Sequence, residues 1–346
     1  MEQPETQEAS PHIWVEDLKE NDLVEGLYLA KVKRLGTTRK GDPFLSVTLA
    51  DRTGDVEARV WDEADVLSAR FSEGDVISVT GRAGSYRNEV QLVLTRAERV
   101  EEVENPALFL ESSSRDVREM MTALRELLGT LQNRDLRRLT ERFLADREFT
   151  GRFKKAPAAK NFHHGYLGGL LEHTLSVCEL VDAAASHYPE LDRDLLLCGA
   201  FLHDVGKIRE YTYRTHIDYS DEGRLLGHVV LGAVMLEERL AALKSFPREL
   251  AMRLKHLVIS HHGEFEFGSP KRPKFLEAFV LHLLDDLDAK VNGLGRFMAR
   301  DRKEGAWTDF NRLFERYFLK GGIEEGDSDG PPSEEEVEKQ RPLFSP

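Results

Sequence analysis

Cysteine and long apolar runs are both scarce in this chain. It has two cysteines, Cys178 and Cys198, among 346 residues, which excludes the disulfide-rich secreted class. Both lie in apolar sequence typical of helices, so we expect two buried free thiols. No run reaches the roughly 18 apolar residues of a membrane-spanning helix. MEQPETQEAS, at the start, lacks the basic and apolar parts of a signal peptide. We therefore expect a cytoplasmic protein without a membrane partner.

Basic residues are fewer than acidic ones, 48 Lys and Arg against 62 Asp and Glu. The formal net charge is −14, and this value alone disfavours a polyanionic partner, because phosphate binding draws on Lys and Arg. The charge is uneven, however, since eight acidic residues face two basic ones between Glu324 and Arg341. A basic cluster near the start comprises Lys31, Lys33, Arg34, Arg39 and Lys40. The charge of the whole chain is therefore a poor guide to the local surface.

The length and the hydrophobic period divide the chain into parts. A chain of 346 residues suggests two or three domains. The hydrophobic period is mostly two over 12–103 and changes to 3.6 afterwards. We predict an all-β domain over 12–103, a helical connector over 104–158 and an all-α domain over 159–321. Residues 1–11 and the acidic tail 322–346 are polar or rich in Gly, Pro and Glu, and we expect both to be disordered.

The β domain shows the strand order of an OB-fold, a small Greek-key barrel that often binds oligonucleotides. Turn signals separate five strand-like runs, and DEADVLSARF between the third and fourth is typical of a short helix. The runs are LVEGLYLAKVKRL, FLSVTLADRTG, DVEARVWD, DVISVTGRAGSY and EVQLVLTRAERV. In the part after residue 107, Ser113 or Ser114 can cap the first helix.

Polar residues recur along the apolar helical stretch. Imidazole and carboxylate groups without thiolates suit a divalent metal that holds water. Each has a plainer explanation: a lone core histidine, a simple His–Asp hydrogen bond, or a histidine pair exposed at a helix end. The hypothesis of a metal site fails only if all of these separate explanations are correct. The residues are His173, His203, Asp204, His228, His261, His262 and Asp285.

The order H…HD…H…HH…D, with HDVGK and LLDDLDAK, resembles the HD superfamily of metal-dependent phosphohydrolases over about 160–320. The resemblance implies that Asp204 and Lys207 are catalytic and that Asp288 supports the site from outside. Lys207 resembles the phosphate-binding lysine of such motifs, with a solvated helix end as the alternative. The implied ligands of one metal are His173, His203, Asp204 and Asp285. Those of a second metal are His228 and one or both of His261 and His262.

Longer strings extend the resemblance. HHGYLGGLLEHT, SHHG and LLDDLDAKVN behind an OB-fold resemble the YhaM-type 3′-5′ exoribonucleases over about 12–320. This implies a manganese-dependent enzyme that releases nucleoside monophosphates from the 3′ end of single-stranded RNA, with DNA left open. His163 and His164 belong to the first string. Three roles stay open for them: substrate contacts, groups that support the site, or parts of a structural turn. No pattern predicts an oligomeric state.

The β domain offers candidate nucleic-acid contacts, because such barrels combine a basic groove with stacking aromatics. In EARVWD, Trp61 shares a face with Arg59 rather than with the apolar Val60, which favours Trp61 as a surface residue. The alternatives are core aromatics and an ordinary solvated basic face. The candidates are Tyr28, Lys31, Lys33, Phe44, Arg59, Trp61 and Tyr86.

Two other functions stay open at this point. One is an HD phosphohydrolase acting on free nucleotides or cyclic dinucleotides, although such a substrate needs no polymer-binding domain. The other is a non-catalytic nucleic-acid-binding protein, although a degenerate site would have lost some of its ligands.

Overall fold

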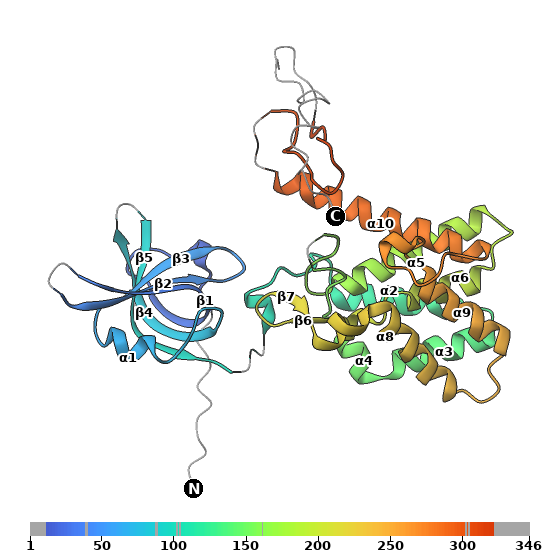
Figure 1. Ribbon diagram of the computed structural model, residues 1–346, viewed down its shortest axis with the longest axis horizontal. Helices are drawn as coiled ribbons and strands as arrows, with labels where there is room; N and C mark the ends of the chain where they lie inside the picture. The colour runs from blue at the N-terminus through green and yellow to red at the C-terminus, as the bar shows by residue number, and fades with distance from the viewer. Residues whose placement is uncertain are drawn as a thin grey trace, which may run out of the picture.

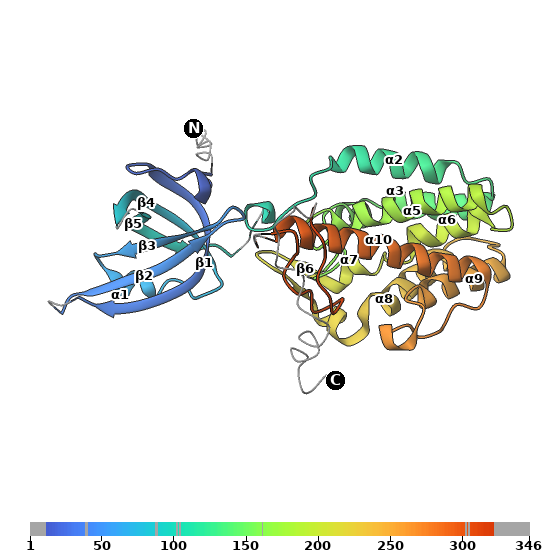
Figure 2. The same ribbon diagram turned by 90° about the horizontal axis from the view of Figure 1, so that it is seen from above.

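The computed structural model describes residues 12–38, 41–86, 89–101, 103, 105–160, 162–301, 303 and 305–321. The two stretches expected to be disordered, 1–11 and 322–346, lie outside the described residues, as do Arg39 and Lys40 of the basic cluster. Figures 1 and 2 show a β barrel beside a larger helical body, with the segment between β5 and α2 leading from one to the other. Among the residues described, no helix combines the length and apolarity that a membrane crossing requires.

The β domain is a closed five-stranded barrel with the strand order β1-β2-β3-β5-β4. Neighbouring strands are antiparallel except β3 and β5, which are parallel. The short helix α1, Ala64–Ser68, lies between β3 and β4. The OB-fold predicted from the order of the strands is therefore confirmed. The strands are β1 Leu23–Thr37, β2 Pro43–Ala50, β3 Asp55–Val60, β4 Val76–Tyr86 and β5 Glu89–Arg99.

Tyr28 lies inside this barrel, and its predicted contact with nucleic acid is corrected. Its side chain is 0% exposed among the core residues, and its hydroxyl donates to the carbonyl oxygen of Ile13 at 2.5 Å. A ring without an exposed face cannot stack on a base. On β1, Tyr28 lies between the half-buried Leu27 and Leu29, and the barrel closes over the side on which it lies.

The second domain is helical, as predicted, apart from a short hairpin (Figure 1). Its long helix α10 runs beside α5, α6 and α9. The first helices are α2 Val117–Gly129, α3 Arg134–Ala145, α4 Arg147–Phe153, α5 Gly169–His187 and α6 Arg193–Leu202. The later ones are α7 Lys207–Glu210, α8 Asp221–Ala241, α9 Arg248–Ser260 and α10 Leu276–Arg300, and the hairpin strands are β6 Tyr211–Tyr213 and β7 Ile217–Tyr219. Single 3-10 turns are η1 Val15–Asp17, η2 Pro106–Leu108 and η3 Phe265–Phe267.

Helices α2 to α4, expected as a connector, pack into the same core as the later helices. Leu124, Phe143 and Phe153 are buried in one hydrophobic cluster with residues such as Leu175 and Leu254. This stretch is thus built into the helical domain. The cap expected at Ser113 or Ser114 is Asp116, which accepts from the backbone N–H groups of Arg118 and Glu119.

Three local features differ from the helical pattern of the sequence. Helix α6 ends at Leu202, directly before the HD dipeptide, and α7 begins at Lys207. The following YTYRTHIDY forms the β6–β7 hairpin, as its β-branched and aromatic residues favour. Inside α8, Gly227 has a φ of +70° and kinks the helix directly before His228. The break between α6 and α7 and the kink at Gly227 both lie beside residues of the candidate site.

Candidate metal centre

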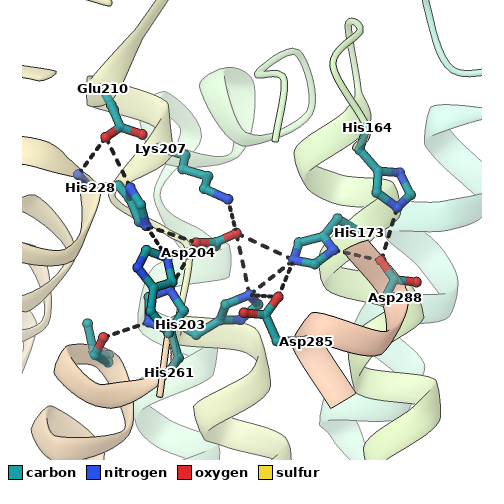
Figure 3. A network of polar contacts seen from close by, with 12 residues as sticks. His164, His173, His203, Asp204, Lys207, Glu210, His228, His261, Asp285 and Asp288 are labelled. Carbon is teal, nitrogen blue, oxygen red and sulfur yellow. Dashed lines mark hydrogen bonds and ion pairs between the residues drawn. The ribbon is translucent and has the colours of Figure 1, made fainter. Parts of the chain in front are cut away.

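Donor atoms from three parts of the helical domain meet at one point. His173 lies on α5, His203 and Asp204 follow α6, and Asp285 lies on α10 (Figure 3). Nε2 of His173 is 3.2 Å from Nε2 of His203 and 3.1 Å from Oδ1 of Asp285. Oδ2 of Asp204 is 3.4 Å from Nε2 of both histidines. The four residues predicted to share one metal are therefore brought together.

A second group adjoins the first. His228 from α8 and His262, which follows α9, have Nε2 atoms 3.2 Å apart. Nε2 of His228 and Nε2 of His261 each lie 3.6 Å from Oδ1 of Asp204. Asp204 thus directs one carboxylate oxygen to each group. The place of Asp204 in the sequence did not reveal that it contacts both groups.

These separations suit metal ions. Donors bonded at about 2.1 Å with angles of about 90–110° lie roughly 3.0–3.4 Å apart. Within the described part of the chain, Oδ1 of Asp204 and Nε2 of His261 are buried and accept or donate no hydrogen bond. Such atoms are costly unless a cation is bound. The residues present therefore fit divalent metal, and the clusters form a metal site.

Hydrogen bonds outside the two groups orient the histidine rings. Nδ1 of His203 donates to the Ala200 carbonyl at 2.7 Å, and Nδ1 of His261 donates to the Val258 carbonyl at 2.7 Å. Nδ1 of His228 lies 3.0 Å from Oε1 of Glu210. Each ring therefore presents Nε2 to the site, as a metal ligand requires. A role for Glu210 was not predicted, because nothing in the local sequence pattern indicates one.

Asp288 and His164 lie outside the two ligand groups, behind His173. Oδ2 of Asp288 accepts from Nδ1 of His173 at 2.7 Å and from Nε2 of His164 at 3.0 Å. Ser176 donates to the other carboxylate oxygen of Asp288. His164 has a φ of +45°, and its backbone N–H donates to Asn292 at 2.8 Å. His164 thus supports Asp288 from a tight turn and does not enter the site.

The charges of the site are strongly coupled. Burial by itself would lower the pKa of His203, but Asp204 and Asp285 outweigh it and raise this pKa to about 9. Burial likewise opposes the ionised form of Asp204, but Lys207, His203 and His173 hold the pKa of Asp204 well below its usual range. Without metal, the first group therefore holds protons where a cation would otherwise balance its carboxylates.

Lys207 is part of the site rather than a solvated helix end. Its side chain is buried, and its Nζ lies 2.5 Å from Oδ2 of Asp204. Gly206 allows this arrangement, because a Cβ at that position would lie 2.0 Å from the carbonyl oxygen of His228. The break between α6 and α7 thereby turns the Lys207 ammonium toward the carboxylate.

A cavity of about 580 Å³ opens onto the metal ligands. His163 lines it, and burial foremost lowers the pKa of His163 to about 3, so this ring is neutral. Aromatic walls come from Phe162, Phe267 and Phe314, which the sequence analysis did not single out. The other lining residues are Lys207, His262, His282, Asp285, Asp286, Ala289, Lys290, Leu313, Glu315 and Arg316.

On the barrel, three candidate contacts form one surface. The rings of Phe44 and Trp61 have centroids 5.5 Å apart, and the Arg59 guanidinium lies 5.4 Å from the Phe44 ring centroid. Trp61 is 51% exposed, as its alternation with Val60 predicted. Tyr86, at the end of β4, is 59% exposed. These side chains are placed as stacking residues require.

The two lysines of the barrel already have protein partners. Nζ of Lys31 donates to Asp55 at 2.7 Å, in an exposed ion pair. Nζ of Lys33 donates to the carbonyls of Ser68 and Phe71 at 2.7 and 2.6 Å. Lys33 therefore ties β1 to the turn after α1, which is a structural role that its basic neighbours in the sequence concealed.

Comparisons with known proteins agree with this geometry. The family model described as "HD domain" matches residues 170–290, and the one described as "OB-fold nucleic acid binding domain" matches residues 29–100. A protein called 3′-5′ exoribonuclease YhaM from Bacillus subtilis (strain 168) is 36% identical over 290 residues, which are 83% of this chain and 91% of that protein. Proteins of the same name from Bacillus velezensis and Geobacillus sp. (strain WCH70) are 35% and 34% identical over 290 residues. They are covered over 91% and 88% of their lengths, again by 83% of this chain. With its OB-fold barrel and its HD domain both matched, this chain belongs to the YhaM family of 3′-5′ exoribonucleases.

Proposed function

We propose that this chain is a divalent-metal-dependent exoribonuclease that removes nucleoside monophosphates from the 3′ end of single-stranded RNA. The observation that carries the proposal is the pair of ligand groups joined by Asp204 beside an aromatic-lined cavity. The cavity volume of about 580 Å³ falls in the usual range for small-ligand pockets, about 300–1,000 Å³. The activity named for its relatives is the one that suits this site.

Each ligand group has an assigned set of residues. His173, His203, Asp204 and Asp285 would hold one ion, and His228, His261 and His262 together with Asp204 would hold a second. Paired divalent ions supply an activated water near neutral pH and neutralise charge on phosphate oxygens. We assign Mn²⁺ as the working metal, because the family resemblance implies it and carboxylate-rich sites that retain water suit it.

The chain's own side chains position the substrate. Lys207, now paired with Asp204, supplies the cation that a phosphate at this site needs. The neutral ring of His163 has a buried Nδ1 without a hydrogen-bond partner in the described residues, and it offers that atom to the substrate. Phe162, Phe267 and Phe314 receive the terminal base, and such stacking tolerates any sequence.

The barrel holds the strand upstream of the cut. Phe44, Arg59, Trp61 and Tyr86 provide stacking and charge, whereas Tyr28 and Lys33 maintain the barrel. RNA is assigned over DNA because the relatives carry exoribonuclease in their names. The cytoplasmic location remains part of the proposal, which the two buried free thiols, Cys178 and Cys198, support.

The direct test follows a 5′-labelled single-stranded RNA on a gel, with protein stripped of metal and then supplied with Mn²⁺ or Mg²⁺. We expect a ladder that shortens from the 3′ end, requires metal, and disappears in Asp204→Ala while RNA binding and folding persist. Internal fragments would contradict an exonuclease. Intact RNA together with hydrolysis of free nucleotides would instead indicate a small-nucleotide phosphohydrolase. The same sequence as DNA tests the choice of RNA.

A second test removes residues 1–103. The barrel and the helical domain have separate hydrophobic cores, so the helical domain retains its own core. We expect binding of a long RNA to weaken far more than hydrolysis of a small phosphodiester. Equal losses of both would contradict the division of roles between the domains.

A further inference from the structure

A second cavity, of about 390 Å³, adjoins the one at the metal centre. Phe162 and Leu313 line both cavities. One face of α10 runs along them, with Asp285 and Ala289 in the first cavity. At about 1.5 Å per residue, this face extends roughly 22 Å from Asp285 to the helix end. The second cavity is therefore a continuation of the site away from the metal ligands. Its α10 residues are Gly293, Arg296, Phe297 and Arg300.

Phe162 marks the boundary between the two cavities. Its ring packs directly on the backbone of α10, because a Cβ at Gly293 would lie 2.5 Å from a ring carbon. The Phe314 ring faces it from the segment after α10, with the centroids 5.9 Å apart. The two rings contact each other and together form an aromatic wall where the two cavities meet.

Arg296 and Arg300 line the second cavity, and both bind the carboxylate of Glu111. An Nη of Arg296 donates to Oε2 of Glu111 at 2.7 Å, and Arg300 donates to the same oxygen. Two guanidinium groups around one anionic oxygen form the kind of arrangement that binds phosphate. Glu111 and Arg300 are each 56% exposed at their side chains, so solvent and ligands reach the pair.

The position of Glu111 in the chain also bears on this subsite. It belongs to the segment between η2 and α2 that leads from the barrel to the helical domain. Figure 2 shows that the C-terminal end of α10 is the end nearer the barrel. The two arginines therefore lie on the way from the barrel to the metal centre.

We propose that Arg296 and Arg300 form a phosphate subsite for the upstream backbone of the RNA, and that Glu111 occupies it when RNA is absent. The inference rests on the proposed function, because the same strand must reach the metal centre. Between Asp285 and the two arginines lie roughly 16–22 Å along the helix. At about 3.4 Å per stacked nucleotide, this span corresponds to roughly five to seven nucleotides. The subsite therefore favours long strands over short ones.

The test measures RNA binding with metal chelated, so that no cleavage is needed, by fluorescence anisotropy of labelled 12-mer and 3-mer RNA. We expect Arg300→Ala to weaken 12-mer binding at least about fivefold and to reduce the salt slope by about 0.7. Its 3-mer binding should stay unchanged. Glu111→Gln should tighten 12-mer binding about two- to fivefold, a gain that misfolding cannot produce. Arg300→Lys should lie between the wild-type protein and Arg300→Ala.

The chain offers a matched control pair. Arg193 donates to Asp182 at 2.6 Å and lies beside Asp192, whose N–H donates to Glu277 in the first turn of α10. This is the opposite end of that helix. Arg193→Ala and Asp182→Asn should leave 12-mer binding unchanged.

Three results would contradict the phosphate subsite. Unchanged 12-mer binding in Arg300→Ala, no gain in Glu111→Gln, or an equal loss in Arg193→Ala would overturn the subsite. Hydrolysis of bis(p-nitrophenyl) phosphate is assayed in parallel with metal restored. Its absence from the wild-type protein would count against the proposed function alone, because the binding results do not depend on it.

Discussion

Nδ1 of His173 lies 2.7 Å from Oδ2 of Asp288, so the ring presents Nε2 to Asp204 and Asp285. The Asp288 carboxylate also accepts from His164, so it is held from two sides. A carboxylate behind a metal-binding histidine fixes its tautomer and raises its basicity. The first ligand group therefore depends on a residue that does not enter it.

Asp288→Asn should weaken metal binding about 10- to 100-fold, because the ring of His173 loses its anionic anchor. The measurement is a titration of Mn²⁺ into metal-free protein, with activity at saturating metal as a second readout. Asp286→Asn is the control, since Asp286 pairs with Lys290 and with no histidine of the site. Equal losses in both variants would contradict this role of Asp288.

Metal affinity should rise with pH up to about 9. The pKa of His203 in the metal-free fold is about 9, above its ordinary value, because Asp204 and Asp285 outweigh burial. A ligand imidazole must lose its proton, so metal binding below this pKa releases a proton and becomes weaker as pH falls. Isothermal titration in buffers of different ionisation enthalpy measures the released protons. An affinity that does not change between pH 6 and 8 would contradict the expected competition.

The proton on His203 also contributes to the stability of the metal-free protein. Because its folded pKa lies above the unfolded value, the stabilisation is complete below pH about 6.5 and is lost as pH rises through about 9. Thermal unfolding of the metal-free protein across this range, compared with the Mn²⁺-bound protein, shows how much of the loss the metal removes.

Exposed and buried aromatics of the barrel should respond in opposite ways. Trp61→Ala should weaken single-stranded RNA binding by about 1–3 kcal/mol, or about 5- to 150-fold, and leave folding intact. Tyr28→Phe removes the hydroxyl that donates to Ile13, so it should lower the free energy of unfolding by about 0.5–1.5 kcal/mol. Its RNA affinity should stay unchanged. Anisotropy and thermal melts measure the two quantities, and a loss of RNA binding in Tyr28→Phe would count against its place in the core.

Gly206→Ala should destabilise the helical domain. The added Cβ would lie 2.0 Å from the carbonyl oxygen of His228 and 2.6 Å from the backbone nitrogen of Gly232, so α7 and α8 must separate. We expect a loss of about 1–3 kcal/mol in the free energy of unfolding, with weaker metal binding. Gly295→Ala, which meets no atom within 4 Å among the described residues, should be neutral or stabilising by up to about 1 kcal/mol. Equal effects would show that helix propensity, rather than this close approach, governs both positions.

Periodicity predicted the two domains because strand and helix periods are local properties. The change from a period of two to one of 3.6 separates the barrel from the helices, and both are present. The local pattern missed the β6–β7 hairpin and the kink at Gly227, since a few residues in a helical stretch carry too little signal. It also could not show that α2 to α4 share the core of the later helices, because that depends on which faces pack together.

The types of the candidate ligands and their order along the chain could be predicted from the sequence. His173, the pair His203–Asp204 and Asp285 stand out because polar groups in apolar helices need a partner. That Asp204 directs one oxygen to each ligand group, and that Lys207 is buried against it, became clear from the three-dimensional structure. Which atom of a side chain faces a neighbour depends on packing between helices far apart in the chain, and the local pattern of residues does not encode it.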